Sequence, residues 1–196
     1  CGRDQREGRG VNHELPRHRP ARRFAYADPP YLGCSKFYDH PDAAIWDEKA
    51  AHFDLIAAMD EDFHGWAYSC NSGDLLWLAP WVASLAPGIR IGSWSKPFAA
   101  FKANVRIAYT WEPVIFRPAL PRREGDPIGR DHLAEPITLR RGLTGAKPHR
   151  FNRWVLDLMG YQAGDLLIDM FPGTGGMQKA LDEPVLHLQR PIVFAG

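Results

Sequence analysis

Cysteine is scarce in this sequence, and long hydrophobic runs are missing from it. Only Cys1, Cys34 and Cys70 occur among 196 residues. Because they are odd in number and widely spaced, we expect neither a disulfide framework nor a zinc site, and their usage fits a reducing cytosol. No apolar stretch is long enough to span a bilayer, and there is no signal-peptide pattern. The sequence therefore predicts a cytoplasmic protein without a membrane partner.

Several signatures of metal and nucleotide sites are also missing. The eight histidines are scattered, and none lies at metal-ligand spacing from another histidine or a cysteine. There is no dinucleotide-binding G-x-G-x-x-G, no phosphate loop ending in Gly-Lys-Ser/Thr, and no Gly-x-Ser-x-Gly nucleophile motif. We therefore expect no bound metal and none of the chemistry that these motifs support.

The positive charges are clustered, although the formal net charge is only +1. Basic residues gather in segments 3–23, 120–125 and 139–143. Basic runs beside glycine and proline are most often solvated and mobile, and contact with phosphates is the alternative. The sequence therefore predicts a flexible basic arm over residues 1–22, followed by one domain over residues 23–196.

Strand-like and helix-like segments alternate through this domain, whose length suits a single sizeable core. The patterns predict strands at 24–28, 65–72, 89–97, 105–118, 164–171 and 184–189, and helices at 47–63, 73–88, 147–160 and 172–181. This alternation predicts an α/β fold with a mostly parallel sheet. Residues 119–142 have no periodicity and are predicted to form a loop or a short variable insert.

Two of these segments also carry a prediction about burial. In the first helix, Trp46, Ala50, Phe53 and Ala57 fall on one face, which predicts that this face packs on the sheet. The strand that ends at Phe171 is a continuous apolar run, which is typical of a strand buried on both faces.

One strand end carries an acid, two prolines and an aromatic residue, Asp28-Pro29-Pro30-Tyr31. Two prolines in a row end a strand, because neither can donate a hydrogen bond to the sheet. In an open α/β sheet, ligands bind beyond the carboxyl ends of the strands. The purely structural interpretation is a proline turn with a capping aspartate. The functional interpretation is a binding site at the carboxyl ends of the strands.

A second strand end is rich in glycine, over residues 169–176. Gly173, Gly175 and Gly176 lack the β-carbon that would keep a ligand away from the backbone, and the following helix begins with free N–H groups. Alone, such a turn is as often purely structural as functional.

Together, the two turns resemble the motifs of the S-adenosylmethionine (SAM)-dependent amino-methyltransferases of nucleic acids, of the adenine-N6 and cytosine-N4 type. The catalytic motif of that family is Asp/Asn/Ser-Pro-Pro-Tyr/Phe/Trp, and its cofactor motif is a strand ending Asp-x-Phe-x-Gly-Ser/Thr-Gly. This chain has Asp28-Pro29-Pro30-Tyr31, Asp169-Met170-Phe171-Pro172-Gly173-Thr174-Gly175 and the family's Lys-Pro pair as Lys147-Pro148. The run at 111–116 looks like the strand before the family's variable region, and the resemblance spans about residues 24–181.

The motif order, catalytic first and cofactor last, resembles the permuted beta group and small methylases of actinobacterial phages. The resemblance implies a Rossmann-like methyltransferase fold with a mostly parallel central sheet, a β-hairpin edge, a circularly permuted motif order and one outer strand missing. It also implies the cofactor SAM and, in a bacterial or phage-infected cell, adenine-specific methylation of DNA. By resemblance, the catalytic residues are Asp28, Pro29, Pro30 and Tyr31, and the cofactor-binding residues are Asp169, Phe171, Pro172, Gly173, Thr174, Gly175, Lys147, Pro148 and Phe151.

The residues of the first motif suit methylation of an exocyclic amine. The Asp28 carboxylate can accept one N–H of the amine, and the Pro29 carbonyl can accept the other. Tyr31 would stack on a base that has been flipped out of the duplex or arrives single-stranded. An aspartate in the first position fits adenine better than cytosine, for which the family more often has serine.

Two departures from the family leave alternatives open. Residues 119–142 are too short to read several base pairs, so specificity would be low, lie in the loop Leu32 to Trp46, or come from a partner chain. The strand at 184–189 ends on Gln189, where the family has an acid for the ribose hydroxyls. A catalytically weak or inactive binding module is therefore one alternative, and amino-methylation of RNA or of cytosine is another.

Overall fold

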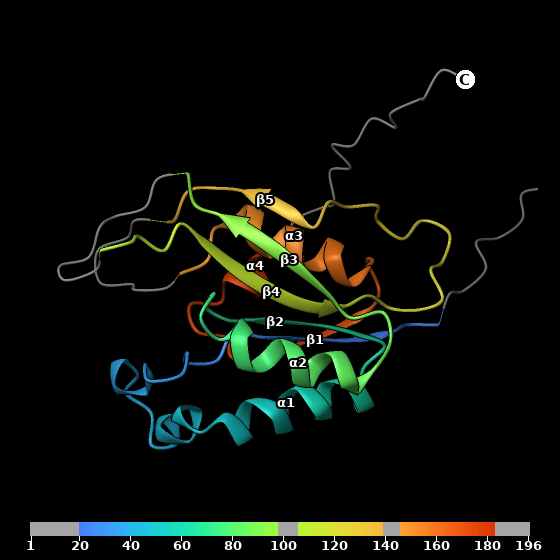
Figure 1. Cartoon of the computed structure of the whole chain (residues 1–196). Coiled ribbons are helices and arrows are strands. Elements are labelled where there is room, and N and C mark those ends of the chain that lie inside the picture. The colour runs from blue at the N-terminus through green and yellow to red at the C-terminus, as the bar shows by residue number, and fades with distance from the viewer. Residues whose placement is uncertain (1–19, 98–105, 139–145, 183–196) are drawn as a thin grey trace, which may run out of the picture.

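The computed structural model describes residues 20–97, 106–138 and 146–182. The predicted strand at 184–189, most of the basic arm and the basic segment 139–143 lie outside these ranges. Within them, the chain forms one mixed sheet whose strands follow the order β5-β3-β4-β2-β1-β6 (Figure 1). The strands are β1 (Arg23–Ala27), β2 (Gly65–Ser69), β3 (Arg90–Ser95), β4 (Trp111–Arg117), β5 (His132–Ala134) and β6 (Leu166–Asp169).

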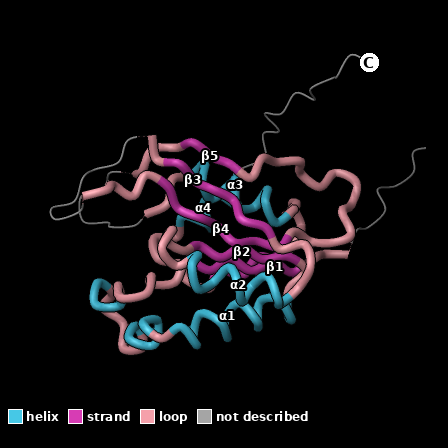
Figure 2. Tube along the Cα trace, in the orientation of Figure 1, coloured by secondary structure: helices cyan, strands magenta, loops and turns pink. Residues whose placement is uncertain are grey.

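Helices cover both faces of this sheet. The helices are α1 (Lys49–Asp62), α2 (Leu75–Leu85), α3 (His149–Met159) and α4 (Gly176–Asp182), with short 3-10 turns at Ser35–Phe37 and Ala43–Asp47. Helices α1 and α2 lie on one face and α3 and α4 on the other, as the helix and strand colours of Figure 2 make visible. The predicted α/β class is therefore confirmed.

Alternation along β1 explains how one strand serves two cores. Phe24 and Tyr26 point to the α3–α4 face, where they join a buried cluster with α3. Ala25 and Ala27 point to the α1–α2 face, where their small side chains let the helices approach the sheet. All four side chains are buried, so β1 lies at the centre of the core.

The sheet is mostly parallel, with one strand reversed. β1 pairs in parallel with β2 and β6, and β5 pairs in parallel with β3, whereas β4 runs antiparallel to both of its neighbours. The predicted hairpin is present as β3–β4, but it is not the edge of the sheet. β5 lies outside it, formed by residues 132–134 of the segment that was predicted to have no strand. Three residues are too few to give a periodic signal in the sequence.

The two strands that end in the candidate motifs are neighbours, as predicted. Arg23 of β1 pairs with Leu166 of β6, and Tyr26 pairs with Asp169. However, β6 is the outermost of the described strands rather than a central one. Leu166 and Ile168 are 53% and 36% exposed, so the expectation of burial on both faces is wrong for the described residues. Apolar composition alone does not show how far the covering helices reach.

The buried face of α1 also differs from the prediction. His52, Ile56 and Met59 are its buried residues, whereas Ala50 is exposed. The prediction failed because it treated His52 as polar. The His52 imidazole is buried against the Tyr68 hydroxyl, and its other ring nitrogen lies 2.8 Å from the carbonyl oxygen of Trp46. Both ring nitrogens therefore have partners, which offsets the cost of burial.

The basic arm ends earlier than predicted, because Arg22 is buried in the core. Its guanidinium donates to the Asp126 carboxylate at 2.6 and 3.0 Å, to the carbonyl of Gly160 at 2.7 Å, and to Asp165 at 3.3 Å. These contacts join the start of β1 to the segment after β4 and to the end of α3. The ion pairs lie near the amino end of β1, so they support the fold at the edge of the sheet away from both motifs.

Candidate active site

The directions of the strands bring several charged residues at strand ends to one edge of the sheet. Asp28 directly follows β1, Asp169 is the last residue of β6, and Lys96 directly follows β3. Because β4 runs the opposite way, its second residue, Glu112, lies at this same edge. Residues from four separate parts of the sequence therefore meet at the carboxyl ends of the parallel strands.

The Asp-Pro-Pro-Tyr turn is held rigidly at the end of β1. Pro29 and Pro30 are buried, and their rings restrict the backbone that follows the aspartate. The Asp28 side chain is 22% exposed, so its carboxylate can be reached from solvent. The backbone N–H of Met170 donates to the carbonyl of Tyr26 at 2.9 Å. This bond fixes the end of β6 against the end of β1.

The Lys147 ammonium lies at the centre of the site. Its Nζ is 3.2 Å from Oδ1 of Asp28 and 2.9 Å from Oε2 of Glu112, and it donates to the Tyr31 hydroxyl at 3.0 Å. It also lies about 5.5 Å from the centre of the Tyr31 ring, within the range of a cation–π contact. Lys147 was predicted among the cofactor-binding residues, yet its charged end contacts two of the predicted catalytic residues.

Glu112 and Lys96 complete this cluster, and the sequence analysis assigned neither of them to the site. Glu112 accepts from Lys96 through Oε1, and from Lys147 and the Tyr31 hydroxyl through Oε2. Its only signal in the sequence is one acid inside an apolar strand. A carboxylate in such a strand is costly to bury unless it is paired, and here two ammonium groups pair with it.

Burial and charge shift the pKa values of the cluster in different directions. Burial raises the pKa of Asp28 above its usual value; Lys147 opposes this effect and Glu112 reinforces it. Burial also acts to raise the pKa of Glu112, but Lys147 and Lys96 outweigh it and bring that pKa down to about 2. The pKa of Tyr31 is raised by burial and by the two carboxylates. At neutral pH Glu112 is therefore an ionised carboxylate and Tyr31 a neutral phenol.

The glycine-rich turn lies at the same edge, after β6. Gly173 and Gly175 have φ angles of 46° and 70°, which residues with a β-carbon rarely adopt. Pro172, Gly173 and Thr174 are exposed. The N–H of Phe171 donates to the Asp169 carboxylate at 3.2 Å. The turn therefore offers exposed backbone next to a carboxylate, as the sequence analysis expected.

Gly176 is required for close helix packing rather than for an unusual backbone conformation. A β-carbon there would lie 2.9 Å from the side-chain nitrogen of Asn152 in α3 and 4.0 Å from the backbone oxygen of Lys147. The glycine therefore lets α4 pack closely against the start of α3. This packing places the glycine-rich turn beside the segment that carries Lys147.

Pro148 and Phe151 lie next to Lys147 but are not open to solvent. Pro148 is buried before the first turn of α3, and Phe151 is fully buried. The Phe151 ring packs 4.8 Å from that of Trp94, and both rings lie about 5.5 Å from the Lys147 ammonium. In the described structure these two rings therefore pack beside the Lys147 ammonium.

The loop after the Asp-Pro-Pro-Tyr turn is tied to both motifs. The Asp47 carboxylate accepts from the N–H of Gly33 at 2.9 Å and from the Ser35 hydroxyl at 2.6 Å. Trp46 stacks edge-on against Phe171 of the second turn, with ring centres 4.9 Å apart. These contacts connect the loop at residues 32–46 to the end of β6.

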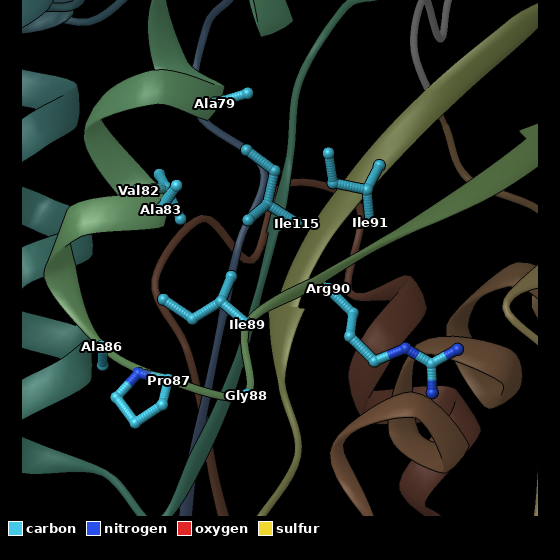
Figure 3. Close-up of a pocket in the computed structure, with 10 residues that line it drawn as sticks. All are labelled: Ala79, Val82, Ala83, Ala86, Pro87, Gly88, Ile89, Arg90, Ile91 and Ile115. Atoms are coloured by element: carbon cyan, nitrogen blue, oxygen red, sulfur yellow. The ribbon is translucent and has the colours of Figure 1, made fainter.

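Two cavities among the described residues lie beside β3, one at each of its ends. One, of about 290 Å³, lies between α2 and the start of β3 and is lined by apolar side chains including Val82, Ile91 and Ile115 (Figure 3). It is at the opposite end of β3 from Lys96, so it does not belong to the candidate site. The other, of about 440 Å³, is lined by residues that include Lys96 and Trp111, so it borders the charged cluster.

The described ranges hold neither a candidate metal-binding cluster nor a candidate membrane-spanning helix. Residues 20–97, 106–138 and 146–182 contain no group of three or more histidine, cysteine or acidic residues arranged to hold a metal ion. No helix within the same ranges has the length and apolar character needed to cross a membrane.

Comparison with protein-family models gives no match, and comparison with curated proteins gives none either. Solved structures are similar to this chain, among them two of M1.HpyAVI. The M1.HpyAVI–SAM complex aligns with a TM-score of 0.53 at 13% identity, covering 82% of this chain and 76% of the other. A crystal structure of M1.HpyAVI aligns with a TM-score of 0.51 at 14% identity and the same coverage. At this low identity the likeness establishes architecture: the chain shares the α/β fold of M1.HpyAVI.

Proposed function

We propose that this protein transfers a methyl group from SAM to the exocyclic amino group of adenine in DNA. One observation carries the proposal: the Asp-Pro-Pro-Tyr turn and the glycine-rich turn follow adjacent parallel strands at the same edge of the sheet. Tyr26 and Asp169 pair in register just before these turns. A base held at the first turn would therefore be next to a ligand held at the second.

The amino group of a base is a poor nucleophile, because its lone pair is shared with the ring. Catalysis therefore depends on orientation and on stabilising the positive charge that develops on nitrogen. The partly exposed Asp28 carboxylate would accept one N–H, and the Pro29 carbonyl would accept the other. The two prolines hold these acceptors in place before the base arrives.

Tyr31 would support the base by stacking. Its hydroxyl donates to Glu112 at 3.0 Å and accepts from Lys147 at 3.0 Å, so the position of its ring is fixed from the far end. A fixed ring can stack on a flipped base with little loss of side-chain entropy. This restraint favours an extruded or single-stranded adenine over a base inside the duplex.

The glycine-rich turn is compatible with SAM. Gly173 is exposed, and a β-carbon at Gly175 would meet no atom within 4 Å, so the backbone there is open to a ligand. M1.HpyAVI, which has the same fold, has been solved in complex with SAM. SAM supplies a methyl group already activated on a sulfonium. The residues that would hold it are Asp169, Phe171, Pro172, Gly173, Thr174 and Gly175, with Lys147, Pro148 and Phe151 alongside.

The aspartate at position 28 favours adenine over cytosine, since the cytosine-specific members of the family that the motifs resemble more often have serine there. The short segment between β4 and α3 leaves little surface for reading base pairs in the major groove. We therefore propose relaxed sequence specificity, or specificity supplied by a partner chain.

The proposal is tested by incubating the protein with SAM that carries a radioactive methyl group. Single-stranded DNA, duplex DNA and RNA of the same sequence are the acceptors, and the methylated nucleosides are separated after digestion. We expect label in N6-methyl-2′-deoxyadenosine from DNA, more from single strands than from duplex. Label in N4-methylcytosine or only in RNA would redirect the proposal, and SAM binding without any transfer would support an inactive binding module.

A further inference from the structure

Glu112 has three partners and uses both carboxylate oxygens to hold them. Oε1 accepts from Lys96, and Oε2 accepts from Lys147 at 2.9 Å and from the Tyr31 hydroxyl at 3.0 Å. Its side chain is 16% exposed. Hydrogen bonds between fully charged partners in such surroundings are stronger than neutral ones. The carboxylate therefore fixes Tyr31, the last residue of the Asp-Pro-Pro-Tyr turn, and Lys147, which contacts Asp28 of the same turn.

Lys147 is shared between two carboxylates on different strands. Its Nζ lies 2.9 Å from Glu112 and 3.2 Å from Asp28. The shorter contact is to Glu112, and the contact to Asp28 is to its Oδ1. The Lys147 ammonium has three N–H donors, and it donates to Glu112 and to the Tyr31 hydroxyl, which leaves one donor for Asp28. The division of Lys147 between Glu112 and Asp28 therefore limits how strongly Lys147 occupies the Asp28 carboxylate.

We infer that Glu112 is a positioning residue of the methyl-transfer site, which holds Lys147 away from Asp28 so that Asp28 can accept an N–H of the substrate. Lys96 is the counter-ion that keeps Glu112 in this position. The inference rests on the proposed function for its meaning in catalysis, although the arrangement of charges can be tested without any turnover.

The pKa of Asp28 depends on this arrangement of charges, because groups from several different strands and loops act on the Asp28 carboxyl. Burial raises the pKa of Asp28, Lys147 and Lys96 lower it, and Glu112 raises it. The titratable groups that act on Asp28 or are acted on by it are Lys147 before α3, Lys96 after β3, Glu112 on β4, Tyr26 on β1, Tyr31 and Tyr38 in the following loop, Tyr68 and Cys70 at the end of β2, and Asp169 on β6.

Two substitutions are expected to shift the pKa of Asp28 in opposite directions. Glu112→Gln removes a negative charge and releases Lys147 toward Asp28, so the pKa of Asp28 falls. Lys96→Gln removes a positive charge and leaves Glu112 to attract Lys147 alone, so the pKa of Asp28 rises. Removing a negative charge and removing a positive charge shift the pKa of Asp28 in opposite directions, and the movement of Lys147 adds to each shift.

The test that does not depend on turnover is a carboxyl carbon NMR titration of the full chain. The Asp28 signal is assigned by its disappearance in Asp28→Asn. We expect it to titrate at lower pH in Glu112→Gln and at higher pH in Lys96→Gln than in the wild type. Glu61→Gln, which removes the same charge from an exposed position on α1, should leave the titration unchanged. Equal titration in all variants, or shifts of the same sign, would overturn the inference.

The catalytic part is measured on the same variants. We expect Glu112→Gln to lower kcat by about ten- to a hundredfold, the worth of a charge-assisted hydrogen bond, with SAM affinity within about twofold of the wild type. The acidic limb of its pH–kcat profile should move to lower pH. Unchanged kcat with shifted NMR titrations would overturn the role in catalysis, whereas a wild type without any methyl transfer would instead contradict the proposed function.

Discussion

The backbone N–H of Met170 donates a 2.9 Å hydrogen bond to the carbonyl of Tyr26, although the two residues lie near opposite ends of the sequence. The Asp-Pro-Pro-Tyr turn begins two residues after Tyr26, and Met170 itself belongs to the glycine-rich turn. This single bond therefore fixes the separation of the two halves of the candidate site. Substitutions in each half can therefore separate their contributions to methyl transfer and to SAM binding.

Replacing Asp28 by alanine should abolish methyl transfer and leave SAM affinity nearly unchanged. The carboxylate lies at the end of β1, where it would contact the base, and not in the glycine-rich turn. Radiolabel transfer and calorimetric titration with SAM measure the two properties on the same preparation. Asp39→Ala removes an exposed carboxylate in the next loop and is the matched control. Turnover at the wild-type rate in Asp28→Ala would refute the catalytic assignment.

Replacing Gly173 by valine should weaken SAM binding. The φ angle of 46° is strained for a residue with a β-carbon, at about 1–2 kcal/mol, and the new side chain would stand between the ligand and the backbone. Gly164→Val is the control, because Gly164 has a φ of 90° and no atom within 4 Å of an added β-carbon but lies at the other end of β6. Both variants should lose stability in urea. Equal SAM affinity in the two would place the cofactor elsewhere.

Replacing Arg22 by methionine should destabilise the fold by about 3 kcal/mol, because it leaves Asp126 and Asp165 buried without their shared cation. The side chain is only 2% exposed, so screening by solvent is slight. Urea unfolding of the wild type and the variant measures the difference. Arg130→Met, at an exposed position, should change stability by less than about 0.5 kcal/mol. Similar small losses in both variants would mean that Arg22 belongs to a solvated arm after all.

Acid should remove part of the stability that Glu112 provides. Its pKa in the folded protein is about 2, below the ordinary 4.5. A lowered folded-state pKa contributes stability that is present above pH 4.5 and is lost as the pH falls toward 2. The stability difference between the wild type and Glu112→Gln should therefore shrink as the pH is lowered from 6 to 3. Urea midpoints across this range measure it, and a difference that stays constant would mean that Glu112 is not ion-paired.

The sequence predicted the parts of the site that follow a strand-end rule. Asp28 and Gly173 both come directly after apolar strands, and strand ends of a parallel sheet share an edge, so their proximity could be anticipated. Glu112 could not, because nothing in its spacing points to Lys147. Only the reversed direction of β4 brings the beginning of that strand to the edge where the others end.

Burial was harder to predict wherever a polar side chain finds a distant partner. Arg22 belongs to a run of basic residues that is typical of a solvated arm, and the acids that bury it lie more than a hundred positions away. His52 was likewise excluded from the buried face of α1, although Tyr68 pairs with it. Local patterns report the average behaviour of a residue type, whereas these exceptions depend on tertiary contacts.

The late position of Lys147 in the chain has a consequence for biosynthesis. A ribosome releases β1 to β5 first, and with them Asp28, Glu112 and Lys96, which together carry one unbalanced negative charge. The ammonium that balances them, and the strand that completes the edge, emerge only with the last quarter of the described residues. The nascent chain therefore carries these acids for some time before Lys147 exists, and the candidate site is complete only when this last part of the chain has been made.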